Sequence, residues 1–285
     1  MHAFHRNQLT LLALLGGAGC ASAPPPPVVR PIPSTARSPG ANATALTTQW
    51  QSMVILDRRD SLVLTLPDGS KQLQRLGRLA YFTLTLNGTA FSVRLDTLQL
   101  APASPEASRE AVGTSWTGWL GAFGRIENLS ISRGGILVEE LTTTVVNLLP
   151  RLPRAGARGG DRWTDTTKQT IRVQVFKTDD QRTARWQVGP ATDRDGLRVV
   201  PVHVREEFEQ VGRGSTAGRK MAMTAQGSRS ATYSGTADGR LDNAVVIDSA
   251  AMLITVPGSQ QSIPTMQYGR TVIRYRPLAT RAPND

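Results

Sequence analysis

The chain has 285 residues, with 33 Lys and Arg against 22 Asp and Glu, which gives a formal net charge of +11 and a pI of 10.9. It contains 1 Cys and 3 His, so it lacks the residues that a disulfide framework or a zinc site needs. The length suits one large β domain or two small ones.

The first residues have the layout of an export signal. Arg6 precedes an apolar run over 9–15, small residues follow, and Cys20 ends the segment. The run is shorter than the roughly 20 residues that a spanning helix needs. The segment resembles the bacterial lipoprotein signal, with Gly17 where that family usually has Leu. The resemblance implies that 1–19 is removed and that Cys20 is acylated. The alternative is a secreted protein cut at an Ala-x-Ala site.

Residues 20–47 carry Pro24 to Pro27 and three further prolines among Ala, Ser and Thr. Such a segment cannot build a packed core, so we expect a semi-rigid tether that packs against nothing. The membrane, reached through the lipid anchor, is the first expected partner. No Asp follows Cys20, and in lipoprotein families this favours the outer membrane, facing the periplasm. Export argues against nucleic acid as the partner of the basic surface.

Arginines gather after residue 150. Arg151, Arg154, Arg158 and Arg162 form one modest concentration. They are interpreted as a solvated loop or as a contact for lipid headgroups or acidic glycans.

Period-two alternation dominates the body of the chain and predicts antiparallel strands. It predicts three strands, each with one apolar face. These faces consist of Phe82, Leu84 and Leu86 in the first strand, Ile171, Val173 and Val175 in the second, and Val200, Val202 and Val204 in the third. Asn87-Gly88 and Asp238-Gly239 signal hairpin turns. One helix is predicted over 139–149, ended by Pro150. The predicted fold class is mainly β: an antiparallel curved sheet or a partly open β-barrel.

Two stretches are alike: residues 124–128 match 239–243 in character, at an offset of 239 − 124 = 115. We interpret them as equivalent turns of two duplicated β half-units, 48–150 and 151–278, joined through the short helix and followed by a disordered tail over 279–285. Arg125 and Arg240 are expected on the outer face. Coincidence is the alternative, because Gly-Arg hairpins recur.

No catalytic set stands out. His203 is the one histidine left after signal removal, and it lies mid-strand without a cysteine partner. Residues 193–196 (DRDG) indicate a plain turn, since they lack the later acids of a calcium loop. The sequence leaves a carboxylate pair for sugar hydrolysis open, because it does not give the distance between acids. We expect no metal, no cofactor and no enzymatic activity.

Aromatic side chains form the candidate site. Trp116, Trp119 and Phe123 crowd into eight residues, and Trp163 opens the second half-unit. In a curved sheet such residues plug the end of a barrel or line an apolar cavity. Gly160-Asp161-Arg162-Trp163 is similar to the Gly-x-Trp opening of lipocalins, with one residue more. The body resembles LolA-like and lipocalin-like envelope lipoproteins.

Two functions follow from these patterns. The first is a non-enzymatic module whose curved sheet binds an apolar ligand, such as a lipid or the acyl chain of another lipoprotein. The second is a structural or assembly protein with a filled core that acts through surface contacts with envelope proteins. An open apolar cavity beside the tryptophans favours the first, and a solid core favours the second.

Overall fold

The computed structural model describes residues 20–21, 45–47, 49–66, 68–153, 155–173, 176–194, 196–216, 219–236, 238–256, 258 and 262–278. The predicted signal peptide, most of the tether, Arg154, Val175 and the predicted tail lie outside the described residues.

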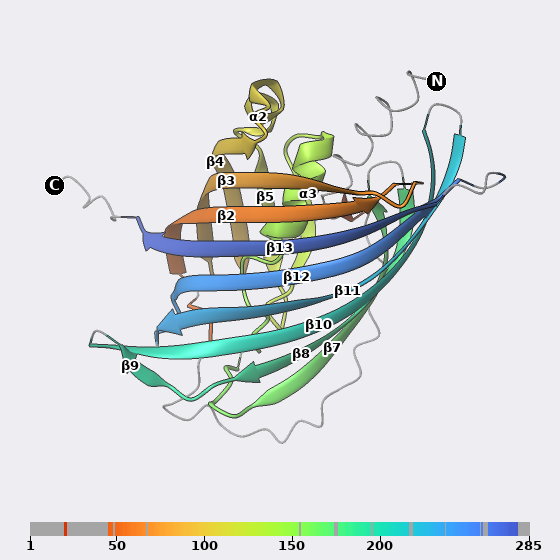
Figure 1. Cartoon of the computed structure of the whole chain (residues 1–285). Coiled ribbons are helices and arrows are strands. Elements are labelled where there is room, and N and C mark those ends of the chain that lie inside the picture. Colours follow the sequence, from red (N-terminus) through yellow and green to blue (C-terminus); the bar gives the residue numbers. More distant parts are fainter. Residues whose placement is uncertain are drawn as a thin grey trace.

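The described part is built of long strands and two short helices (Figure 1). In chain order the elements are β1 (Cys20–Ala21), β2 (Gln49–Thr65), β3 (Lys71–Asn87), β4 (Ala90–Ala101), α2 (Pro105–Ala111), β5 (Ser115–Leu120), β6 (Ile126–Ile131), α3 (Ile136–Val145), β7 (Arg162–Val173), β8 (Phe176–Val188), β9 (Thr192–Arg194), β10 (Leu197–Thr216), β11 (Arg219–Thr236), β12 (Leu241–Thr255) and β13 (Ser262–Pro277).

All strands join one antiparallel sheet in the order β1-β7-β8-β10-β11-β12-β13-β2-β3-β4-β5-β6, with β9 added to β10. Because β13 pairs with β2, the two predicted half-units share one sheet. The sheet is strongly curved and stays open, and α3 lies in its hollow (Figure 1). The predicted fold class is confirmed.

Alternation along the strands creates the hollow. Phe82, Leu84 and Leu86 are buried while their neighbours are not, and the same holds for Val200, Val202 and Val204, as predicted. Each buried set faces the concave side, where it packs with residues of α3 such as Leu141 and Val145. At about 25 cal/mol per Å² of apolar surface, this burial is the main stabilising contribution.

The predicted helix over 139–149 begins and ends earlier in the structure. α3 runs from Ile136 to Val145, and residues 146–149 continue as turns. Its threonines are tolerated because the Thr142 hydroxyl donates to the carbonyl oxygen of Val138 at 2.8 Å. A second helix, α2, was not predicted; it begins with Pro105, a residue suited to the first helical turn.

One strand prediction is wrong. The run from Thr170 to Thr178 is not a single strand, because β7 ends at Val173, β8 begins at Phe176, and these two residues pair. The chain therefore reverses inside an apolar run that carries no Gly, Pro or Asn-Gly signal. Period two records which face a side chain takes and gives no information about such a reversal.

The predicted tether contacts the sheet at both of its described ends, and its prolines lie outside the described residues, so the expectation that they pack against nothing stays a prediction. β1 pairs with β7, with Cys20 opposite Arg172. Near the other end, the Thr47 N–H donates to the carbonyl oxygen of Gly239 at 3.2 Å. The turn that contains Gly239 thus holds the entry of the chain into β2.

The turns over 121–125 and 236–240 are equivalent, as predicted. In both turns the backbone N–H of the first residue donates to the carbonyl oxygen of the fifth residue. The fourth residue is a positive-φ glycine, Gly124 or Gly239, and its N–H donates to the carbonyl oxygen of the first residue. The hairpin over 66–70 has the same pattern and does not fall at the 115-residue offset. The elements before the two turns also differ, since α2 precedes β5 whereas β10 precedes β11. Duplication stays a prediction.

Candidate functional site

The four candidate aromatic residues separate into two groups. Trp116 is fully buried, and its indole N–H donates to Thr142 Oγ1 at 2.7 Å. Trp163 is half-buried and stacks on Trp186, with ring centroids 6.0 Å apart. Trp119 and Phe123 are exposed, at 53% and 37%. The hollow beside Trp116 and Trp163 is filled by α3 and its apolar neighbours, so the open part of the concave face lies elsewhere.

The concave face carries a band of charge between two apolar clusters. The cluster around α3 is the helix cluster, and that of Leu62, Leu64, Phe176, Met221, Met223 and Ile254 is the far cluster. On β2, β8, β11 and β12 the inward-facing charged side chains lie between the two clusters. We call this set the charged belt: Arg58, Asp60, Arg78, Glu140, Asp180, Arg182, Glu206, Arg229 and Asp248.

Arg58 is the most fully paired member of the belt. It donates two hydrogen bonds to Asp60, at 2.7 and 2.8 Å, and two to Asp248, at 3.1 and 3.2 Å. A fifth goes to Thr271 Oγ1 at 3.3 Å. Gly269 lies between the two carboxylates, where an added Cβ would be 2.5 Å from Asp248 and 2.7 Å from Asp60. Because Gly269 has no side chain, both carboxylates have room to accept two hydrogen bonds each from Arg58, and we call this arrangement the double fork.

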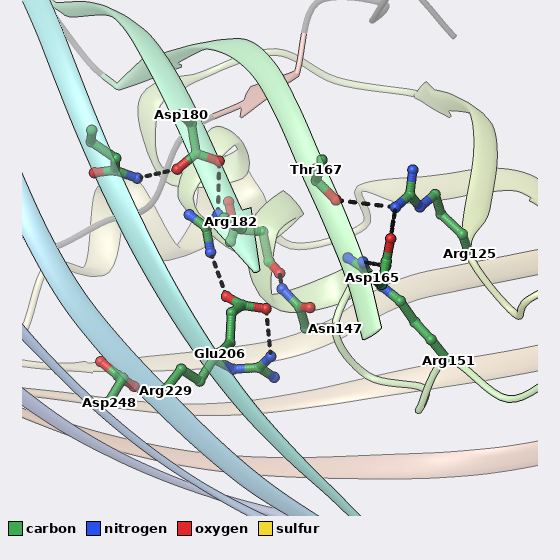
Figure 2. Close-up of polar contacts among 12 residues, drawn as sticks. Arg125, Asn147, Arg151, Asp165, Thr167, Asp180, Arg182, Glu206, Arg229 and Asp248 are labelled. Carbon is green, nitrogen blue, oxygen red and sulfur yellow. Dashed lines mark hydrogen bonds and ion pairs between the residues drawn. The ribbon is translucent and has the colours of Figure 1, made fainter. Parts of the chain in front are cut away.

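A second network joins β8, β10 and β11 (Figure 2). Arg182 Nε is 2.7 Å from Asp180 and its Nη1 is 3.0 Å from Glu206, whose other oxygen lies 3.8 Å from Arg229. Arg229 also donates to the Tyr233 hydroxyl at 3.2 Å, and that hydroxyl donates to the carbonyl oxygen of Asn147 at 2.9 Å. The belt is thereby connected to the segment that follows α3.

Arg78 and Glu140 connect the belt to α3 itself. Arg78 Nη2 is 2.7 Å from Glu140 Oε2, and both side chains are largely buried. Burial raises the pKa of the Glu140 carboxyl, and the charge of Arg78 opposes this rise. Burial likewise lowers the pKa of Arg78, and nearby Arg58 adds to that effect. The Nε of Arg78 is buried without a hydrogen-bond partner.

A cavity of about 150 Å³ lies where the belt meets α3. Its polar lining residues include the arginines of the belt and Thr143, Thr144 and Asn147. Its apolar lining residues are Phe208, Met223, Ala225, Val246, Ala250, Met252 and Ile273, and they share strands with the polar ones, as Val246, Asp248 and Ala250 do on β12. An amphipathic cavity of this kind, with few convergent polar groups, is the usual form of a small-molecule site.

Sequence reasoning missed the belt, although a signal for it exists. In β2 the inward positions are the even ones, and there Leu56 is followed by Arg58, Asp60 and then Leu62. Charges at buried positions of an alternating strand are rare unless they are paired. Asp248 and Arg229 interrupt the inward positions of β12 and β11 in the same way.

Three other charged residues fasten the open edges of the sheet. Arg125, in the β5–β6 turn, donates to Asp165 of β7 at 2.9 and 3.1 Å and to Thr167 at 3.0 Å. Arg151 pairs with the same carboxylate (Figure 2). We call Arg125, Arg151 and Asp165 the clasp. Arg125 and Arg151 are therefore partly buried and paired, which corrects the expectation of an outward Arg125 and of a solvated Arg151. Arg158 and Arg162 are exposed.

The clasp ties stability to pH. Burial alone would raise the pKa of Asp165, but the charges of Arg151 and Arg125 outweigh it and hold that pKa below its ordinary value. A depressed carboxyl pKa contributes stability above the unfolded-state value of about 4 and loses it as the pH falls further. The clasp should weaken only in acid.

Arg125→Ala should lower the free energy of unfolding by about 1–3 kcal/mol, because it leaves a partly buried carboxylate with fewer donors. Arg240→Ala is the matched control, since Arg240 occupies the same turn position and is 54% exposed. It should change stability by less than about 0.5 kcal/mol. Urea titrations of both variants at pH 7 give the comparison, and equal losses would contradict the clasp.

His203 is exposed, with its ring Nδ1 3.0 Å from Thr232 Oγ1. Within the described ranges, no group of three or more His, Cys, Asp and Glu is placed to hold a metal ion. Neither described helix is long and apolar enough to cross a membrane.

No protein-family model matches the chain, and no curated protein does. Solved structures give low-scoring alignments. The attachment invasion locus protein Ail of Yersinia pestis is 7% identical, with 80% of this chain and 99% of that chain covered and a TM-score of 0.18. An outer membrane channel from Pseudomonas putida F1 is 11% identical, with 83% of this chain and 98% of that chain covered and a TM-score of 0.21. OccK2 of Pseudomonas aeruginosa is 6% identical, with 79% of this chain and 98% of that chain covered and a TM-score of 0.23. TM-scores this low carry no argument about function.

Proposed function

We propose that this protein is a lipid-anchored, non-enzymatic binding protein of the bacterial envelope, and that it holds an amphipathic ligand on the concave face of its sheet. The observation that carries the binding proposal is the cavity between α3 and the charged belt, whose lining combines arginines with apolar side chains. The anchor rests on the lipoprotein-like signal that ends at Cys20.

The position of the cavity refines the ligand expected from the sequence. A purely apolar ligand beside Trp116 would have to displace α3, whose Leu141 and Val145 are fully buried there. A ligand in the cavity would instead contact both arginines and apolar side chains such as Met223 and Met252. Methionine side chains suit such a lining because they adapt to irregular shapes.

A second candidate, a structural protein that acts through its surface, is favoured by the outer face. A hollow of about 490 Å³ lies there, floored by Gly227 and bordered by Glu207, Glu209 and Met266. Exposed Tyr268 lies near this border on β13. The filled core around the tryptophans also favours this candidate.

One experiment tests anchor and ligand together. The full chain and Cys20→Ser should be expressed in a Gram-negative host, floated with membranes, purified, and extracted with organic solvent. Wild type should float and incorporate radioactive palmitate, whereas Cys20→Ser should do neither. Because the cavity lies in the folded body, mass spectrometry should still find a non-covalent amphiphile in the extract of Cys20→Ser.

The two halves of the proposal can fail separately. If Cys20→Ser floats and is labelled like the wild type, the anchor is wrong. If neither protein yields a bound amphiphile and none is acquired from added lipid extract, the binding function is wrong and the surface-acting candidate is favoured.

A further inference from the structure

The cavity beside α3 presents more positive than negative charge. Four arginines line it, Arg58, Arg78, Arg182 and Arg229, against two acids, Glu140 and Asp248, which gives 4 − 2 = +2. Three further acids of the belt, Asp60, Asp180 and Glu206, contact Arg58 and Arg182 from outside the lining, so the belt as a whole carries 4 − 5 = −1. The arginines least neutralised by these contacts are Arg78 and Arg229.

The lining arginines also differ in how many of their donors are used. Each guanidinium has five N–H donors, and the five hydrogen bonds of Arg58 use that set. Arg78 donates to Glu140, but its buried Nε has no partner. Arg229 donates one hydrogen bond, to Tyr233, and lies 3.8 Å from Glu206. The Arg78 Nε has almost no accessible surface, so a ligand in the cavity can meet Arg78 only through its terminal nitrogens. Arg229, with one hydrogen bond donated to the protein, has donors left for an acceptor that arrives with a ligand.

Size limits the ligand. A volume of about 150 Å³ corresponds to roughly five waters at about 30 Å³ each, enough for a compact head and a few methylenes but not for a whole phospholipid. Met223 and Met252 line the cavity and also belong to, or pack against, the far cluster. A chain that leaves the head along these methionines stays on apolar surface.

We infer that the cavity binds the anionic head of a single-chain amphiphile, a phosphate or a carboxylate, with Arg78 and Arg229 as its donors and the two methionines on its first methylenes. This inference rests on the proposed binding function and specifies its ligand class. Phosphate and carboxylate each offer two oxygens that can accept side by side from the planar fork of a guanidinium group.

The test compares three probes that differ in one feature each: decyl phosphate, decanoate and decanol. Calorimetric titration of the purified Cys20→Ser protein should show decyl phosphate and decanoate binding at least tenfold more tightly than decanol. If one of the two anions gains more affinity over decanol than the other, its headgroup is the one that the cavity prefers. Equal affinity for the anions and decanol would overturn the inference while the proposed function stands, and no binding of any probe would overturn both.

Variants locate the site. Arg229→Met and Arg78→Met should each weaken decyl phosphate at least tenfold and leave decanol within twofold, whereas Arg59→Met, an exposed arginine outside the cavity, should change neither. If Arg78→Met does not fold, Arg78→Lys keeps the charge, loses the planar fork, and should still weaken the anion. Unchanged affinity in the Arg229 and Arg78 variants would overturn the inference. If inorganic phosphate binds as tightly as decyl phosphate, the alkyl chain contributes nothing and the claim that the ligand is an amphiphile is overturned.

Discussion

Replacing Trp116 by Ala should lower the free energy of unfolding by about 3–5 kcal/mol, the range for a large aromatic side chain removed from a core. The ring is fully buried against Phe82, and its N–H is bonded to Thr142 of α3. The substitution therefore opens a void and also leaves a helix hydroxyl without its donor. Chemical denaturation followed by circular dichroism measures the loss.

Trp119→Ala is the matched control for Trp116→Ala. Trp119 lies in the same short strand, β5, and is 53% exposed. Its replacement should change stability by less than about 0.5 kcal/mol. Similar losses in the two variants would show that Trp116 does not pack against α3 as described.

Replacing Arg58 by Met should cost about 3–5 kcal/mol, because it leaves two carboxylates without their shared partner. Asp60 is 8% exposed and Asp248 18%. Burial alone would lower the pKa of Arg58, but the charges of Asp60 and Asp248 outweigh it and raise that pKa, so the guanidinium stays charged throughout the accessible pH range.

Arg59→Met controls for the loss of one positive charge from the same strand. Arg59 is the next residue, its side chain is 80% exposed, and its contact with Asp57 is 3.5 Å. Exposed pairs of this kind contribute about 0–1 kcal/mol. Equal losses of stability in Arg58→Met and Arg59→Met would contradict the double fork.

Local patterns in the sequence predict the strands well and their arrangement poorly. The alternation around Phe82 and Val202 predicts which side chains are buried, because a half-buried strand requires that period. It contains nothing about strand order, and β13 pairs with β2 although some 200 residues separate them in the chain. The reversal between Val173 and Phe176 is set by pairing with β8, which no local signal announces.

The site was harder to predict than the fold, for a related reason. The prediction selected Trp116, Trp119, Phe123 and Trp163 by residue type, but burial depends on the face of the sheet, and only Trp116 and Trp163 lie on the inner one. The charged belt is assembled from six strands and one helix that are far apart in sequence. Arg125 shows the same limit. It occupies the same position in its turn as the exposed Arg240, and it is paired only because β7 brings Asp165 close to it.

The central claim is that the concave face is the binding face, and residue-level photo-crosslinking tests it most directly. A decyl phosphate that carries a diazirine on its chain should be bound to the Cys20→Ser protein, irradiated, and mapped by mass spectrometry. The account predicts attachment at Met223 or Met252, which line the cavity and not the outer hollow. Attachment confined to the outer-face residues Leu253, Met266 and Tyr268 would contradict it.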